Sequence, residues 1–235
     1  MQSYLLNGEL KMNIVDFGKF NSSFGLVKSP SKVVVESFLS WQQKILPDWG
    51  FELKLEKRQG KLGDALIALC PRTAPIVTRY LFWPVDENWT LYFDNGVSGT
   101  DAGPPSVLSS RLGVDAIRVV MADEVIDPVS GQVTQYPATI LEFYSNGVER
   151  RHIFVANDGG KWKFGELGEP FLFENMAAYK VRSIKDRFTN AMLHSYLKEL
   201  GVNLSNANSV LTEPDLGYLL TKHGKMPASY KEFKD

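Results

Sequence analysis

The pattern of apolar and polar positions changes twice along the chain, and its first clear part is helical. Between Pro30 and Pro47, apolar residues follow one another at intervals of four, three and four, which is the spacing of one face of an α-helix. Ser29 and Pro30 are typical of a helix start, because serine caps the first turn and proline fits its first position. We therefore expect a helix that ends at Pro47. The stripe consists of Val34, Phe38, Trp41 and Ile45.

From residue 51 to residue 166 apolar positions alternate with polar ones, and turn residues interrupt them at regular intervals. Alternation with a period of two is typical of β-strands, and short connections between the runs indicate hairpins, the first of them around Gly60. Pro104-Pro105 and the residues after them predict one short helix before Gly113. The expected strands cover residues 51–57, 64–70, 76–85, 88–93, 116–120, 139–144, 149–155 and 161–164.

The last third of the chain returns to a helical pattern. An apolar residue recurs every four positions up to Gly201, and glycine is the usual residue just after a helix end. Thr189 is a good cap, and it divides this segment into helices over 177–187 and 190–200. Thr212 and the acidic residues after it predict a further helix over 213–223. The repeat consists of Ile184, Phe188, Met192, Tyr196 and Leu200.

Strands first and helices afterwards are typical of an α+β fold. A chain of 235 residues fits one large domain. We expect a mainly antiparallel central sheet with one N-terminal helix and two or three C-terminal helices. In this single domain, covering residues 1–235, residues 1–28 form an arm or an edge strand. Residues 29–175 form the sheet core, and residues 176–235 form a helical part.

Composition narrows the functional classes only slightly. A formal net charge of −1, from 26 basic and 27 acidic residues, gives no general field that favours nucleic acid or anionic lipid. The single cysteine, Cys70, excludes an intramolecular disulfide and suits a reducing compartment. No apolar run reaches the roughly 18 residues of a transmembrane helix. The start lacks the features of a signal peptide, so we expect a cytoplasmic protein.

The Asn95-Gly96 turn is the most informative local feature. It follows an aromatic strand, and Asp94 and Asp101 lie on either side of it. If the loop is compact, the two carboxylates meet and form a cation site or a general acid–base pair. The simpler interpretation, which we favour, is that both aspartates accept backbone hydrogen bonds and hold the loop together.

Residues 47–54 resemble the PD…ExK signature of a nuclease superfamily. Glu52 and Lys54 project from one strand face, and carboxylates of that kind bind Mg²⁺. However, only three residues lie between Asp48 and Glu52, whereas the superfamily places the aspartate on a separate strand. A nuclease or other hydrolase therefore stays as an alternative, with Glu52, Lys54 and Asp64, or Asp94 and Asp101, as its first candidates.

Three further motifs carry less information. His152, His194 and His223 have no second ligand at a zinc-site spacing, so no metal and no cofactor is expected. The 159–161 turn lacks two of the defining residues of a phosphate-binding loop and is better interpreted as a hairpin turn. The basic residues within 180–187 lack interleaved exposed aromatics, so a solvent-facing surface is more plausible than a nucleic-acid groove.

Several stretches between residues 88 and 201 resemble a family of bacterial cytoplasmic proteins of uncharacterised function. That family is in turn similar to the immunity partners of polymorphic toxins. The resemblance implies a shared scaffold and a neutralising protein contact, and it implies no catalytic residue. The stretches are Trp89-Thr90-Leu91-Tyr92-Phe93-Asp94-Asn95-Gly96 with Gly99-Thr100-Asp101, Asn157-Asp158-Gly159-Gly160-Lys161-Trp162 with Gly168-Glu169-Pro170 and Phe173-Glu174, and Asp186-Arg187-Phe188-Thr189 with Met192-Leu193, Tyr196-Leu197 and Leu200-Gly201.

The hypothesis that follows is a non-enzymatic binding protein, most concretely an immunity-type protein that neutralises a toxin by direct contact. Its partner is a protein, with no membrane and no nucleic acid expected. The alternatives are the hydrolase or metal-dependent nuclease above and an oligomerising scaffold. We expect the partner to contact polar hairpin tips, because interface energy concentrates in a few charged and aromatic residues. The expected contact residues are Asp94, Asn95, Asp101, Asn157, Asp158 and Trp162.

Overall fold

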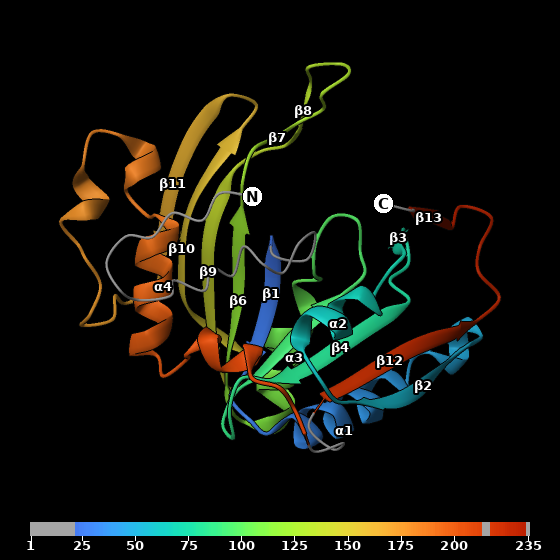
Figure 1. Cartoon of the computed structure of the whole chain (residues 1–235). Coiled ribbons are helices and arrows are strands. Elements are labelled where there is room, and N and C mark those ends of the chain that lie inside the picture. The colour runs from blue at the N-terminus through green and yellow to red at the C-terminus, as the bar shows by residue number, and fades with distance from the viewer. Residues whose placement is uncertain (1–21, 213–216, 234–235) are drawn as a thin grey trace.

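A computed structural model describes residues 22–212 and 217–233, and its centre is a nine-stranded antiparallel sheet (Figure 1). This confirms the α+β class and the mainly antiparallel sheet. In spatial order the strands are β11 (Lys161–Leu167), β10 (Val148–Asp158), β9 (Ala138–Ser145), β6 (Asp115–Ala122), β1 (Ser23–Val27), β5 (Thr90–Asp94), β4 (Arg79–Pro84), β12 (Gly217–Gly224) and β2 (Phe51–Arg58).

Short strands and helices complete the part of the chain that the structure describes. Two small ribbons pair β3 (Arg72–Ala74) with β13 (Lys231–Phe233) and β7 (Val125–Ile126) with β8 (Val133–Gln135). The α-helices are α1 (Ser31–Gln42), α2 (Leu62–Ile67), α3 (Gly103–Leu112) and α4 (Asn190–Glu199). Single 3₁₀ turns are η2 (Pro47–Trp49), η3 (Ala178–Lys180), η4 (Ile184–Asp186) and η5 (Leu204–Asn208).

Strand β1 corrects the expectation of an arm or edge strand for residues 23–27, whereas residues 1–21 of the expected arm lie outside the described residues. It lies in the middle of the sheet, where it pairs with β5 on one side and β6 on the other, and all five of its residues are buried. Helix α3 packs so closely on this strand that a Cβ at Gly25 would stand 2.7 Å from Pro105. The absence of a side chain at Gly25 is therefore what lets a helix cover a central strand so closely.

Two other expectations were wrong. Residues 64–70 were expected as a strand, but they begin within α2, in which Ala65 and Leu66 are buried while Ile67 is 70% exposed. The helix expected over 213–223 is strand β12 from Gly217 onward, and residues 213–216, which include the acidic residues expected at its start, lie outside the described part of the chain. Residues 217–220 are buried, and an apolar run buried on both faces of a sheet carries no period that separates strand from helix.

Both faces of the sheet carry a hydrophobic core, because successive side chains of a strand point to opposite sides. In β4, Tyr80 and Phe82 belong to the cluster that includes Val34 and Phe38 of α1. The neighbouring Leu81 and Trp83 belong to the larger cluster on the other face. Helices α1 and α3 cover the first face, and α2 and α4 cover the second. The sheet is thus the middle of three layers (Figure 1).

The C-terminal helical part is smaller than expected. Helix α4 confirms the predicted helix over 190–200, and the Thr189 hydroxyl caps it by accepting a hydrogen bond from the Met192 amide. The 177–187 segment contains only the 3₁₀ turns η3 and η4. A predicted solvent-facing basic residue, Arg187, packs its guanidinium 5.6 Å from the centre of the Phe164 ring and donates to the Val181 carbonyl.

A buried ion pair holds the segment after β11 against the sheet. The Arg151 guanidinium donates to both carboxylate oxygens of Glu174, over 2.9 and 2.6 Å, and both side chains are almost completely buried. Arg151 also donates to the Leu167 and Gly168 carbonyls, and the Tyr179 hydroxyl donates to Glu174 over 2.8 Å. Arg151 also forms an ion pair with the partly exposed Glu166, so the loss of Glu174 would leave the buried guanidinium with only this partly solvated counter-charge.

We expect Glu174→Gln to lower the free energy of unfolding by about 3 kcal/mol, because the Arg151 guanidinium would lose its buried counter-charge. Urea denaturation followed by circular dichroism measures this loss. Lys28→Met is the matched control, since the Lys28–Asp115 pair spans 3.2 Å at the surface and its loss should cost less than about 1 kcal/mol. Equal losses in the two variants would show that the buried pair does not hold the segment.

Candidate functional site

The loops that the sequence analysis singled out lie at one end of the sheet. The antiparallel registers place the last residue of β5, the first of β1, the last of β6 and the first of β9 on the same side, with Ser23 opposite Val120 and Ala122 opposite Ala138. Strand β10 reaches this end near Ala156, which also pairs with Ala138. We call the loop 95–101, the β7–β8 hairpin over 123–137 and the β10–β11 turn over 157–162 together the strand-end surface.

Asn95 does not lie on the outside of this surface, contrary to its expected role as a contact residue. Its side chain is fully buried, and its Oδ1 accepts hydrogen bonds from the Thr78 and Arg79 amides, each over 3.0 Å. Its Nδ2 donates to the Pro71 carbonyl over 2.8 Å. Asn95 therefore joins the 71–79 segment to the end of β5, and a partner cannot reach it.

Asp94 is also buried, with 1% of its surface exposed, so its expected partner contact is wrong too. The carboxylate accepts hydrogen bonds from the Gly96 amide at 2.9 Å, from the Asp101 amide at 2.8 Å and from the Tyr92 hydroxyl at 2.9 Å. This bears out the interpretation of the aspartates as loop-holding groups, because Asp94 binds the backbone of Asp101. Burial raises the pKa of Asp94 to about 6, although the three hydrogen bonds oppose that shift.

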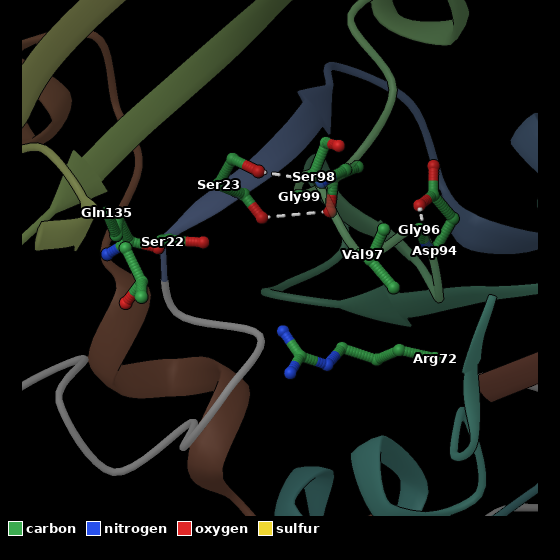
Figure 2. Close-up of a pocket in the computed structure, with 11 residues that line it drawn as sticks. Ser22, Ser23, Arg72, Asp94, Gly96, Val97, Ser98, Gly99 and Gln135 are labelled. Atoms are coloured by element: carbon green, nitrogen blue, oxygen red, sulfur yellow. Dashed lines mark hydrogen bonds between the residues drawn. The ribbon is translucent and has the colours of Figure 1, made fainter. Parts of the chain in front are cut away.

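A polar cavity of about 290 Å³ lies beside Asp94. Figure 2 shows Ser22 and Ser23 at the start of β1, the 96–99 backbone and the Arg72 side chain around this space. Gln135 of β8 completes the side toward the hairpin. The Ser23 hydroxyl accepts a hydrogen bond from the Thr100 amide over 2.7 Å, so this serine, like Asp94, holds the loop. The lining offers hydroxyls and a guanidinium to a small polar molecule.

The remaining expected contact residues lie nearer to solvent. Asp101 is exposed, and its Oδ1 accepts from the Gly103 amide over 3.0 Å. At the β10–β11 turn, Asn157 accepts from the Gly160 amide over 2.7 Å, and exposed Asp158 pairs with Lys163. Trp162 is half-buried against the core. Of the six residues, Asp101 and Asp158 are the ones whose carboxylates are open to a partner.

The β7–β8 hairpin is the part of this surface that sequence reasoning missed. It projects beyond the end of the sheet (Figure 1), and its apolar side chains face solvent, with Val129 95%, Ile126 53% and Val125 47% exposed. Asp127 fixes the turn by accepting hydrogen bonds from the Val129 and Ser130 amides. One signal was present in the sequence: no lysine, arginine or histidine occurs between Arg118 and Arg150.

Of the two sets of nuclease candidates, Glu52, Lys54 and Asp64 do not converge in the part of the chain that the structure describes. Asp94 and Asp101 do lie together, since the Asp101 amide donates to the Asp94 carboxylate over 2.8 Å. Glu52 and Lys54 are exposed on the edge strand β2, and Asp64 is exposed on α2. Within residues 22–212 and 217–233, no group of three or more His, Cys, Asp or Glu side chains could hold a metal ion. His152 lies beside Glu149 and Glu142, at 3.3 and 3.9 Å, whereas His194 lies on α4 and His223 on β12.

Comparisons with known proteins add no assignment. No family model, no curated protein and no solved structure matches this chain. Among the helices of the described residues, none is both long and apolar enough to cross a membrane. Function therefore has to be argued from the surfaces and cavities of the chain itself.

The buried Asp94 carboxylate predicts an unusual pH dependence. Because its pKa is raised from 3.8 to about 6, its protonated form is favoured in the folded state. Its contribution to stability is complete below about pH 4 and is lost as the pH rises through about 6, an effect on the order of 3 kcal/mol. Urea titrations measure the free energy of unfolding of the wild type and of Asp94→Asn at each pH. The wild-type value minus the variant value should fall by on the order of 3 kcal/mol as the pH rises from about 4 through about 6.

Asp158→Asn provides a control of opposite sign. The pKa of Asp158 is lowered by its hydrogen bond to Lys163, so its contribution is present above the ordinary pKa of an aspartate and is lost as the pH falls. The free energy of unfolding of the wild type minus that of Asp158→Asn should therefore rise with pH. A wild-type minus Asp94→Asn difference that stays constant or rises with pH would contradict the desolvated state of Asp94.

Proposed function

We propose that the protein is a bacterial cytoplasmic binding protein of the immunity type, which neutralises a toxin by direct contact through its strand-end surface. The observation that carries this proposal is the β7–β8 hairpin, which presents exposed apolar side chains among carboxylates and without any basic residue. The resemblance of residues 88–201 to proteins of this kind agrees with it. Catalysis is not required, because a neutralising protein acts by occupying a surface.

The hairpin has the composition of a contact surface. Protein interfaces consist of an apolar centre surrounded by a polar rim, and a few residues carry most of the energy. Here Ile126 and Val129 supply the apolar centre, and the exposed Asp123 and Glu124 lie at the rim. Tyr136, 44% exposed, follows β8 and adds an aromatic side chain.

The conformation of the hairpin is held before any partner binds. Besides the two bonds to Asp127, the Thr134 hydroxyl donates to the Val125 carbonyl over 3.1 Å. The Gln135 side chain donates to the Asp123 carbonyl over 2.8 Å. A loop that is already ordered loses less conformational entropy on binding, which favours affinity.

The charge of the hairpin indicates the chemistry of the partner. Asp123, Glu124 and Asp127 are not balanced by a cation within the hairpin. On the neighbouring turn, which joins the hairpin through the Asn157 amide and the Pro137 carbonyl, Asp158 is paired with Lys163. An acidic surface accelerates and orients association with a basic one. The proposed partner is therefore a basic toxin domain.

We expect Val129→Asp to weaken binding of the toxin domain encoded beside this protein about 100-fold, because a central apolar contact would become a desolvated charge. Calorimetry or surface plasmon resonance with the purified domain measures this change. Leu167→Asp is the control: Leu167 is 61% exposed but pairs with His152, toward the other end of β10 and β11. The Leu167→Asp variant should bind the toxin domain with the affinity of the wild type.

Two results would contradict the proposal. One is the absence of binding to any product encoded nearby. The other is an equal loss of affinity in Val129→Asp and Leu167→Asp. If size-exclusion chromatography instead shows a dimer that Val129→Asp separates into monomers, the hairpin is an oligomerisation surface, as the scaffold alternative requires.

A further inference from the structure

A second cleft of about 440 Å³ lies between the end of α1, the start of β2 and the 75–77 segment. Its size is within the range of small-molecule sites, which are mostly apolar and contain a few polar groups. Aromatic side chains form much of its wall, and Trp49 stands at its rim with 76% of its surface exposed. The aromatic residues are Phe38, Trp41, Trp49, Phe51 and Tyr80.

Lys222 supplies a cation to this cleft. Its ammonium group lies 5.7 Å from the centre of the Phe51 ring and 5.4 Å from that of Tyr80. No ion pair involves Lys222 among the described residues, and burial lowers its pKa. An ammonium group that is partly desolvated and lies over two ring faces would gain a charge-assisted hydrogen bond from a ligand carboxylate.

Asp101 supplies an anion to the same cleft. One of its carboxylate oxygens holds the Gly103 amide over 3.0 Å, and the residue is exposed. Burial lowers the pKa of the Lys222 ammonium group, although the nearby carboxylates of Asp94 and Asp101 oppose that shift. The two groups do not form an ion pair with each other, so each can bind an opposite charge on one ligand.

We propose that this cleft binds a free aromatic amino acid. The aromatic ring would pack against Trp49, Phe51 and Ile45, the carboxylate would pair with Lys222, and the ammonium group would pair with Asp101. A ligand that carries only a negative charge would be repelled by Asp101, and one that carries only a positive charge would be repelled by Lys222. A zwitterion with an apolar ring satisfies both charges and the aromatic wall. This inference does not rest on the proposed toxin contact, which centres on the β7–β8 hairpin. Asp101 is the residue that the cleft shares with the strand-end surface.

Isothermal titration calorimetry with the intact protein tests this proposal through three probes that share one ring. They are L-tryptophan, indole-3-propionate, which lacks the ammonium group, and tryptamine, which lacks the carboxylate. We expect tryptophan to bind at least about tenfold more tightly than either of the others. Tryptamine binding as tightly as tryptophan, or no heat from any probe at about 10 mM, would overturn the proposal.

Variants of Lys222 and Asp101 test which charged group of the ligand each residue binds. Lys222→Met should weaken tryptophan and indole-3-propionate at least about tenfold. Asp101→Asn keeps an oxygen for the Gly103 amide, and it should weaken tryptophan while leaving indole-3-propionate unchanged or tighter. Lys225→Met, three residues along and exposed, is the matched control and should change neither. A Lys222→Met variant that is folded by circular dichroism and binds tryptophan like the wild type would refute the assignment.

Discussion

The position of β1 between β5 and β6 is the constraint on which the rest of the molecule depends. Without this strand the sheet would separate into one half made of β6, β9, β10 and β11 and another made of β2, β4, β5 and β12. The start of β1 is tied to both halves: the Met121 amide donates to the Ser22 carbonyl, and the Thr100 hydroxyl donates to the Ser23 carbonyl. The relative placement of the 95–101 loop and the β7–β8 hairpin follows from these bonds.

This constraint divides the polar groups of the strand-end surface into two kinds. Asp94 and Asn95 are buried, and their hydrogen-bonding atoms bind the backbone of the chain. Burial of such groups is stable only when they are paired, so their pairing is a condition of the fold. The groups left for a partner are exposed to solvent, on the projecting hairpin, at Asp101 and at Asp158 of the β10–β11 turn. The same packing that pairs the buried polar groups thus also determines which polar groups stay exposed.

The aromatic cleft arises in a similar way on the α1 face of the sheet. Lys222 comes from β12, a strand that pairs with both β4 and β2. The Lys222 amide donates to the Thr78 carbonyl over 2.7 Å, which places its side chain beside Tyr80. Trp49 is positioned by η2, directly after α1 ends. Four segments that are remote in sequence therefore surround one space, and two opposite charges remain in it without pairing with each other.

Local signals in the sequence were enough for the elements whose cause is local. Helix α1 has an apolar stripe, α3 begins with two prolines, and α4 has a side-chain cap at Thr189. Each of these features lies within a few residues of what it determines, so a pattern detects it. The turn residues Asn95 and Asp94 were recognised for the same reason, because short polar side chains bond to nearby backbone.

Only the tertiary structure decided which of these residues a partner can reach and where β1 and β12 lie. Asn95 is buried because the 71–79 segment packs on it, and nothing within its own loop specifies that neighbour. Residues 217–220 are buried because strands flank β12 and a hydrophobic core covers each face of the sheet. In this environment apolar and polar residues do not alternate, so the sequence lacks the period of two by which a strand is recognised. Burial and the meeting of distant side chains depend on the packing of whole layers, which the sequence of one segment does not contain.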